Sequence, residues 1–178
     1  MSHHGLLIPE ITMTPIRTQW STVTSLTVSC TMYSAPLVET FEERIDHFIQ
    51  LRELQDETNG FLAFIPLQYQ IGDTKLRTNK ISPIDDLKMI ALSRLMLDNI
   101  PHIKSYWVTI GEATASVGLN FGADDLDGTI GEEKIMHAAS ANSPAGLARS
   151  RMISLITEAG KIPVERDALY NEVKVHAS

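Results

Sequence analysis

Apolar residues recur at helical spacing in the run FEERIDHFIQLRELQDE, which occupies residues 41–57. Such spacing places apolar side chains on one face of a helix. The positions on this face are Ile45, Phe48, Ile49 and Leu54. Thr40 and Glu43 have the spacing of a capping box, and Asn59–Gly60 is a pair that commonly ends helices. The pattern predicts a helix over residues 41–57.

Three further stretches carry the start and stop signals of helices. Ser82–Pro83 supplies a cap and a first-turn proline before the apolar face of residues 84–99, which predicts a second helix there. A short stretch rich in small residues, 112–120, is expected to form a third helix. Ser143–Pro144 is expected to begin a last helix, and Gly160 to end it.

Short apolar runs between these helices are typical of buried strands. They are FLAFIPL, expected to end at Pro66, IKSYWVTIG at residues 103–111, and the residues that lead into FGADDLDGTIG at 121–131. A poorly defined strand is expected near SLTVSCTM, residues 25–32. Alternating strands and helices predict an α/β fold with a parallel sheet and right-handed crossovers. About four such units make either half of an eightfold barrel or a small doubly wound sheet, with functional residues at the carboxyl ends of the strands.

The first thirty residues differ from the rest of the chain. They are rich in Thr and Ser and lack apolar residues at helical spacing. We therefore expect a divergent, poorly defined lead-in over residues 1–30 and one organised domain over 31–178. The chain length of 178 residues suits a single domain with a buried core.

Composition narrows the functional classes. The formal net charge is −7 and the basic residues are scattered, so the sequence lacks the basic patch of a nucleic-acid-binding protein. It also lacks a long apolar run and the charged-then-apolar pattern of a signal peptide, and we expect a cytoplasmic protein without a membrane span. Cys30 is the single cysteine, which excludes an internal disulfide and a zinc site of several thiolates.

Three carboxylates stand together in FGADDLDGTIG: Asp124, Asp125 and Asp127. One interpretation is a solvated turn in which an Asp caps the next helix. A calcium loop is disfavoured, because the run lacks alternating ligands and a closing bidentate Glu. The functional interpretation is that a carboxylate, with Thr129 beside it, faces a polar substrate at the rim of a pocket.

His137 is a second candidate. Thr129 and Glu132 form another capping-box pair, which predicts a helix that carries His137 in its second turn. A histidine there could orient a carboxylate or transfer a proton, although a lone helical histidine is more often a structural residue. We therefore take Asp125, Asp127, Thr129 and His137 as the candidate substrate-binding residues, with no catalytic residue assigned.

Four separated runs resemble, in the same order, the C-terminal half of the aminodeoxyfutalosine synthases, radical S-adenosylmethionine enzymes of the futalosine route to menaquinone. The runs are EERIDHFIQLRELQDETNGFLAFIPL, KISPIDDLKMIALSRLMLDNIPHIKSYWVTIG, LNFGADDLDGTIGEEKIMHAASA and LITEAGKIPVERDALYNEV. The resemblance covers about residues 31–173. ADDLDGT followed by EEKIMHAA resembles this family more than its relatives, the dehypoxanthine futalosine cyclases and the tyrosine-using enzymes of deazaflavin (F0) synthesis.

The resemblance implies a (β/α)8 barrel in which three cysteines of a CxxxCxxC loop hold a [4Fe-4S] cluster that cleaves S-adenosylmethionine. In that family the adenosyl radical adds to the enolpyruvyl double bond of 3-[(1-carboxyvinyl)oxy]benzoate, and rearrangement with loss of the carboxyl group gives aminodeoxyfutalosine. Such chemistry needs a barrel mouth that excludes water and holds the alkene close to the radical.

The sequence departs from this family in two places. It contains no CxxxCxxC, and Cys30 alone cannot hold a cluster that needs three protein thiolates. Ala35–Pro36 also stands where the family usually carries Gly-His, which puts a pocket histidine in doubt. We therefore expect the chain to be inactive alone and to require a separate N-terminal half. Its open strand edges are expected to cause self-association or aggregation.

Several alternatives remain open from the sequence. The chain could be a non-catalytic half-barrel that binds a small molecule, or a decayed fragment of the enzyme. It could belong to the related cyclase or deazaflavin branch instead. A stand-alone flavodoxin-like sheet with an unrelated function is a further alternative, which predicts helices on both faces of the sheet.

Overall fold

The computed structural model describes residues 17–20, 30–33, 40–68, 82–128 and 146–176, and from Thr40 onward their side chains. The helices are α1 (Phe41–Thr58), α2 (Pro83–Met96), α3 (Trp107–Ile110), α4 (Glu112–Gly118) and α6 (Arg149–Glu158). The strands are β1 (Arg17–Trp20), β2 (Cys30–Tyr33), β3 (Ala63–Gln68), β4 (His102–Tyr106), β5 (Asp125–Asp127), β6 (Ile162–Arg166) and β7 (Glu172–Val175).

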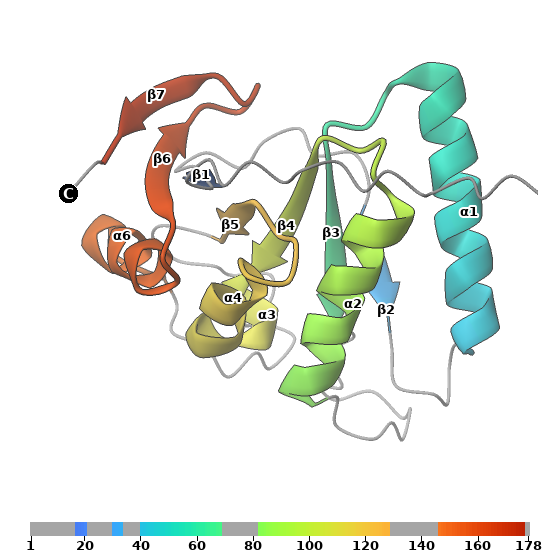
Figure 1. Cartoon of the computed structure of the whole chain (residues 1–178), viewed down its shortest axis with the longest axis horizontal. Helices are drawn as coiled ribbons and strands as arrows, with labels where there is room; N and C mark the ends of the chain where they lie inside the picture. The colour runs from blue at the N-terminus through green and yellow to red at the C-terminus, as the bar shows by residue number, and fades with distance from the viewer. Residues whose placement is uncertain (1–16, 21–29, 34–39, 69–81, 129–145, 177–178) are drawn as a thin grey trace, which may run out of the picture.

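The described strands form one seven-stranded sheet in the order β2-β3-β4-β5-β1-β6-β7 (Figure 1). Neighbouring strands from β2 to β6 run parallel, and β7 runs antiparallel to β6. The predicted α/β class with a parallel sheet is confirmed. The estimate of about four strands is too low, since β1, β6 and β7 were not anticipated.

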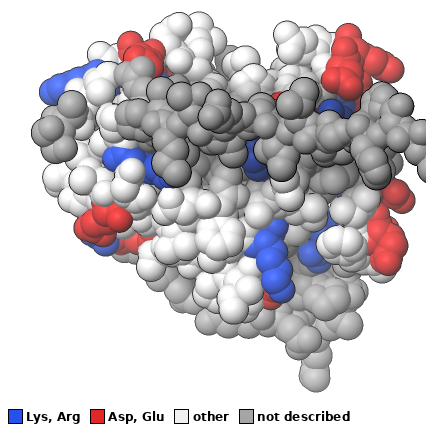
Figure 2. Space-filling model, viewed as in Figure 1, with Lys and Arg blue, Asp and Glu red and all other residues white. Residues whose placement is uncertain are grey.

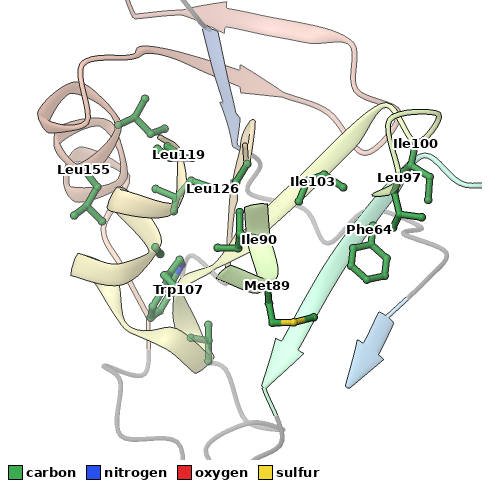
Figure 3. Close-up of a cluster of buried hydrophobic side chains, with 14 of the residues drawn as sticks. Phe64, Met89, Ile90, Leu97, Ile100, Ile103, Trp107, Leu119, Leu126 and Leu155 are labelled. Atoms are coloured by element: carbon green, nitrogen blue, oxygen red, sulfur yellow. The ribbon is translucent and has the colours of Figure 1, made fainter. Parts of the chain in front are cut away.

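The described helices pack on one face of the sheet (Figure 1). Strands β3, β4 and β5 and helices α1, α2, α3, α4 and α6 all supply buried side chains to one hydrophobic cluster. Figure 3 shows Ile90 of α2 beside Leu126 of β5. In this view Trp107 lies below them, and Leu155 of α6 lies at the left edge of the cluster. Side chains alternate between the two faces of a strand. On the opposite face, β4, β5 and β6 carry the paired charged side chains Lys104, Asp125, Asp127 and Arg166.

The two long helices begin as their sequences predict. Thr40 and Glu43 form a complete capping box at the start of α1, and Ser82 and Asp85 form one at the start of α2. These side chains satisfy backbone N–H groups that have no partner within the helix. Asn59 ends α1 in the left-handed conformation, with φ 47°. Both predicted helices are confirmed.

Other boundaries differ from the sequence predictions. Residues 103–111 were predicted as one strand, but the chain turns into α3 at Trp107. Pro66 does not end its strand, because β3 continues to Gln68. The last helix begins at Arg149 rather than at Ser143–Pro144, and its N-cap Ala148 makes no side-chain hydrogen bond. The predicted helix carrying His137 lies outside the described residues.

Gln55 is a buried polar residue that connects three segments of the core. Its side-chain amide donates to the carbonyl oxygen of Phe61 at 3.1 Å and to that of Asn99 at 3.2 Å. Its side-chain oxygen accepts the backbone N–H of Phe61 at 2.8 Å. The end of α1 is thereby joined to the lead into β3 and to the turn before β4. Buried polar groups paired in this way fix the geometry of a core.

Charged residues on the surface are dispersed. Among the described residues on the face shown in Figure 2, Lys and Arg side chains are spread over several places, with Asp and Glu among them. These described side chains do not form the continuous basic patch that a phosphate backbone requires. Within the described ranges, every helix is too short or too polar to cross a lipid bilayer.

Candidate functional site

Two of the three candidate carboxylates are part of a strand and not of a turn. Asp125 begins β5 and Asp127 ends it, and both are buried. The interpretation as a solvated turn is therefore wrong for these two residues. Leu126 between them points into the apolar core, so alternation directs both carboxylates to the charged face. Only Asp127 lies at the carboxyl end of the strand, level with Tyr106 at the end of β4.

Asp125 is the centre of a buried ionic cluster. Arg166 of β6 contacts it with two nitrogens, Nε at 3.2 Å and Nη2 at 2.5 Å, and both side chains are fully buried. The hydroxyl of Tyr170 donates to the same carboxylate at 2.8 Å. A bidentate guanidinium–carboxylate pair fixes orientation as well as charge. The ion pair therefore connects β6 to β5 across β1, which lies between them.

Lys104 connects Asp125 to Asp127. Its Nζ donates to Asp127 at 2.7 Å and lies 4.0 Å from Asp125, and its side chain is 1% exposed. Gly128 donates its backbone N–H to the other oxygen of Asp127 at 2.9 Å. We call Lys104, Asp125, Asp127, Arg166 and Tyr170 the buried charged cluster. Its two carboxylates balance its two cations, as burial of charge requires.

The loop between β6 and β7 places Tyr170 over the cluster. Asp167 accepts the backbone N–H groups of Leu169 at 2.8 Å and Asn171 at 2.9 Å, which folds the loop back on itself. Tyr170 takes a left-handed conformation with φ 65°. Its ring lies 3.9 Å from the guanidinium carbon of Arg166, in cation–π geometry. The loop thus covers the ion pair with an aromatic ring.

Asp124 has a different role from its neighbours. It accepts hydrogen bonds from Arg94 of α2 at 2.7 Å and from the backbone N–H of Ile103 at 2.8 Å. Its second oxygen lies 2.6 Å from Nδ1 of His102, whose ring stacks on Tyr170 at 3.8 Å. Asp124, directly before β5, therefore joins α2 to the start of β4, and the His102 ring connects this group to the β6–β7 loop.

Burial changes the acid–base behaviour of the cluster. Loss of water and, to a smaller extent, the charge of Asp127 raise the pKa of Asp125 to about 6, against the opposing effects of Arg166 and Lys104. Burial also raises the pKa of Tyr170, so its hydroxyl stays protonated and donates to Asp125. Tyr170 is therefore a permanent donor, whereas Asp125 titrates close to neutrality.

Asp127 is the candidate residue best placed to meet a substrate. Its side chain is 11% exposed, against 1% for Lys104 and none for Asp125 and Arg166. It stands at the carboxyl edge of the sheet, directly before Gly128. In this arrangement the Asp125–Arg166 pair connects β5 to β6, and Lys104 orients Asp127. Thr129 and His137 lie outside the described residues, so their place beside Asp127 stays a prediction.

Close packing at this edge requires a glycine. Gly128 has φ +147°, and a Cβ atom built on it would lie 1.9 Å from Nε1 of Trp107. The Trp107 ring is fully buried, and its Nε1 has no hydrogen-bond partner among the groups that the structure describes. Gly128 thus lets the backbone pass directly over the indole at the end of β5.

Sequence reasoning missed three members of the cluster. Lys104 stands inside the apolar run IKSYWV, and a lysine in a buried strand was a signal for a buried acidic partner. Arg166 and Tyr170 belong to VERDALY, where no strand was predicted. Their contacts with Asp125 span 41 and 45 residues, a separation that local patterns do not reveal.

The residues present do not fit an iron–sulfur cluster. The chain has one cysteine, and a [4Fe-4S] cluster of the implied kind needs three protein thiolates. Within the described part of the chain, His, Cys, Asp and Glu residues do not gather in threes as a metal ion would require. The carboxylates of the buried charged cluster are instead neutralised by Lys104 and Arg166.

Comparison with known proteins gives consistent results. Residues 58–178 match the protein family described as the CofH/MqnC C-terminal region. An aminodeoxyfutalosine synthase of Thermus thermophilus is 48% identical over 143 residues, which cover 78% of this chain and 38% of that protein. A cyclic dehypoxanthine futalosine synthase of Halalkalibacterium halodurans is 40% identical over 76% of this chain and 36% of its own length.

A third relative is more distant. The 5-amino-6-(D-ribitylamino)uracil–L-tyrosine 4-hydroxyphenyl transferase 2 of Methanosarcina barkeri is 37% identical over 77% of this chain and 38% of its own length. The chain thus spans less than two fifths of the length of each of these three relatives.

Proposed function

Because this chain belongs to the CofH/MqnC C-terminal region family, we propose that it forms the substrate-side wall of a radical S-adenosylmethionine enzyme of the futalosine route to menaquinone. The 48% identity to an aminodeoxyfutalosine synthase carries this proposal. Identity falls to 40% for the cyclase branch and to 37% for the tyrosine-using branch. The enolpyruvyl-benzoate substrate of the first branch is therefore preferred over those of the other two.

The wall would be a half-barrel whose charged face turns toward the substrate. The one-sided packing of the described helices supports this arrangement over a doubly wound sheet, which needs helices on both faces. Asp127 is proposed to accept a hydrogen bond from the substrate, with Thr129 and His137 beside it. Lys104 holds the carboxylate in place, and Asp125 with Arg166 fixes the strands beneath it.

If the chain takes part in catalysis, the cluster-binding part lies outside these 178 residues, because their one cysteine cannot ligate the cluster. We propose a separate N-terminal half as this partner. Strand β2 at the end of the sheet has one described neighbour, β3, and its other edge could pair with a strand of that half. S-adenosylmethionine and the [4Fe-4S] cluster would then be held by the partner, and this chain alone would not catalyse.

Reconstitution of the two halves tests the proposal. The chain would be mixed with the N-terminal part of the Thermus relative that it does not match, carrying a reconstituted cluster. Aminodeoxyfutalosine formation from S-adenosylmethionine and 3-[(1-carboxyvinyl)oxy]benzoate would be followed by mass spectrometry. We expect product from the mixture and none from either half. Product from this chain alone would overturn the claim that it is incomplete.

A substitution at Asp127 tests its proposed role in this reaction. Asp127→Asn keeps the size of the side chain and removes its charge, so we expect product formation by the mixture to fall at least tenfold. Glu172→Gln is the control, because Glu172 lies exposed on β7. Equal losses from the two variants would contradict the role of Asp127.

A non-catalytic binding module is the second candidate function. Two observations favour it. The charges of the buried charged cluster are paired with one another, and the sequence contains no CxxxCxxC loop. Equilibrium dialysis of the enolpyruvyl-benzoate against the chain separates the two candidates. Binding to the chain without product from the mixture supports the module, whereas neither binding nor product supports a decayed fragment.

A further inference from the structure

Strand β1 stands out by its place in the sheet. Residues 17–20 come first among the described residues, yet they lie between β5 and β6 near the end of the chain (Figure 1). β1 runs parallel to both neighbours, with Gln19 level with Asp125 on one side and with Val164 on the other. This segment lies outside the family match, which begins at residue 58.

The two neighbours of β1 are buried strands. The β5 residues are all buried, and so are Pro163, Val164, Glu165 and Arg166 of β6. Without β1, each strand would present an unpaired edge of backbone N–H and C=O groups inside the protein. An unpaired buried backbone group costs about 1–3 kcal/mol, so this gap requires an occupant.

The gap also has a fixed width. Arg166 on β6 reaches across the position of β1 to Asp125 on β5, with both side chains fully buried. Strands two positions apart in a sheet are separated by about 9–10 Å. The ion pair therefore holds β5 and β6 at the spacing of one intervening strand.

We propose that the space between β5 and β6 is a strand-acceptor site, that residues 17–20 of the same chain occupy it, and that an extended peptide of the same sequence can replace them. Main-chain hydrogen bonds in a parallel register provide the recognition. The ligand class is thus an extended polypeptide segment with free N–H groups. The inference rests on strand pairing and does not depend on the proposed function.

A peptide-exchange experiment tests the site. The full-length chain with Thr18→Pro and Gln19→Pro loses the N–H groups on both sides of β1, because neighbouring residues of a strand point their N–H groups to opposite edges. A fluorescein-labelled peptide of residues 14–23 is titrated against it and followed by anisotropy. We expect binding at least tenfold tighter than to the wild-type chain. Thr18→Ala with Gln19→Ala, which keeps the N–H groups, should behave like the wild type.

A folded proline variant that fails to bind the peptide, or equal binding to all three proteins, would overturn the proposal. A second measurement does not depend on the stability of that variant. With Cys30→Ser as background, Arg17→Cys and Ile162→Cys occupy paired positions and should form an intramolecular disulfide on mild oxidation. Arg17→Cys with Val164→Cys, two residues out of register, should not. No cross-link, or a cross-link between two chains, contradicts occupation by the same chain.

Discussion

The side chain of Asp125 is completely buried and lies near two cations, Arg166 and Lys104. Its carboxylate meets Arg166 and Lys104, which favour the ionised form, while burial and Asp127 favour the protonated form. Loss of water has the larger effect, so the pKa rises from 3.8 to about 6. The folded chain therefore binds more protons than the unfolded chain between these two values.

This pKa predicts how stability depends on pH. The contribution of Asp125 to the free energy of unfolding is largest below about pH 4 and falls as the pH rises to 6, because the folded state must release a proton that it binds more tightly. The advantage of the wild type over Asp125→Asn should shrink between pH 4.5 and 7.5, by about 2 kcal/mol at most. Urea unfolding at four pH values measures it.

Asp98→Asn is the control for this experiment. Asp98 is exposed, and the hydrogen bond from Arg52 lowers its pKa below 3.8. Its stabilising effect is present above pH 4 and lost only at lower pH. The difference between wild type and this variant should stay constant over the same range. A constant difference for Asp125→Asn as well would contradict the raised pKa.

Gly128 allows a second prediction at this scale. Gly128→Ala would place a methyl group 1.9 Å from Trp107 Nε1, so backbone or indole must move. Gly111→Ala is a matched control, since Gly111 also has a positive φ of +82° but nothing within 4 Å of the new Cβ. Both changes strain the backbone. We expect Gly128→Ala to lower the free energy of unfolding by about 1–3 kcal/mol more than the control, measured by urea denaturation. Equal losses would contradict the close contact.

Gln55 shows how one side chain can join three elements. Gln55→Ala would leave the N–H and carbonyl of Phe61 and the carbonyl of Asn99 without this partner in a buried region. We expect a loss of about 2–4 kcal/mol in the free energy of unfolding. Gln50→Ala, an exposed position on the same helix, should cost less than about 0.5 kcal/mol. Hydrogen exchange at Phe61 should accelerate in the first variant and stay unchanged in the second.

The sequence predicted those elements well that depend on interactions between residues close in sequence, and it missed those that depend on partners far away in the chain. Capping boxes and apolar periodicity act within a few residues, so α1 and α2 were predicted at close to their observed bounds. β6 carries Glu165 and Arg166, whose burial depends on partners elsewhere in the chain, and its charged sequence hid a strand. A strand next to the acidic run was predicted, but β5 itself begins at Asp125. Its position was missed because Asp125 and Asp127 resemble turn residues until Lys104 and Arg166 are placed beside them.

The sheet as a whole predicts how the chain behaves in solution. Its two end strands differ, because β7 is exposed and carries Lys174, a residue that discourages further pairing. β2 at the other end is expected to pair with a second copy when no partner half is present. Sedimentation velocity should show association that increases with concentration. Thr31→Lys in β2 should reduce it, and Thr157→Lys on the exposed surface of α6 should not. Association unaffected by Thr31→Lys would place the contact elsewhere.

The position of β1 between β5 and β6 also affects the order in which the strands can pair while the chain is being synthesised. A ribosome makes residues 17–20 first, but their neighbours at 125–127 and 162–166 emerge only after most of the chain has been translated. The β3–β4 pairing can form earlier, since it needs only residues 63–103. Insertion of β1 between its two neighbours is therefore a late event, and its long sequence separation makes it slow. A nascent chain arrested before residue 162 would still expose residues 17–20 to protease.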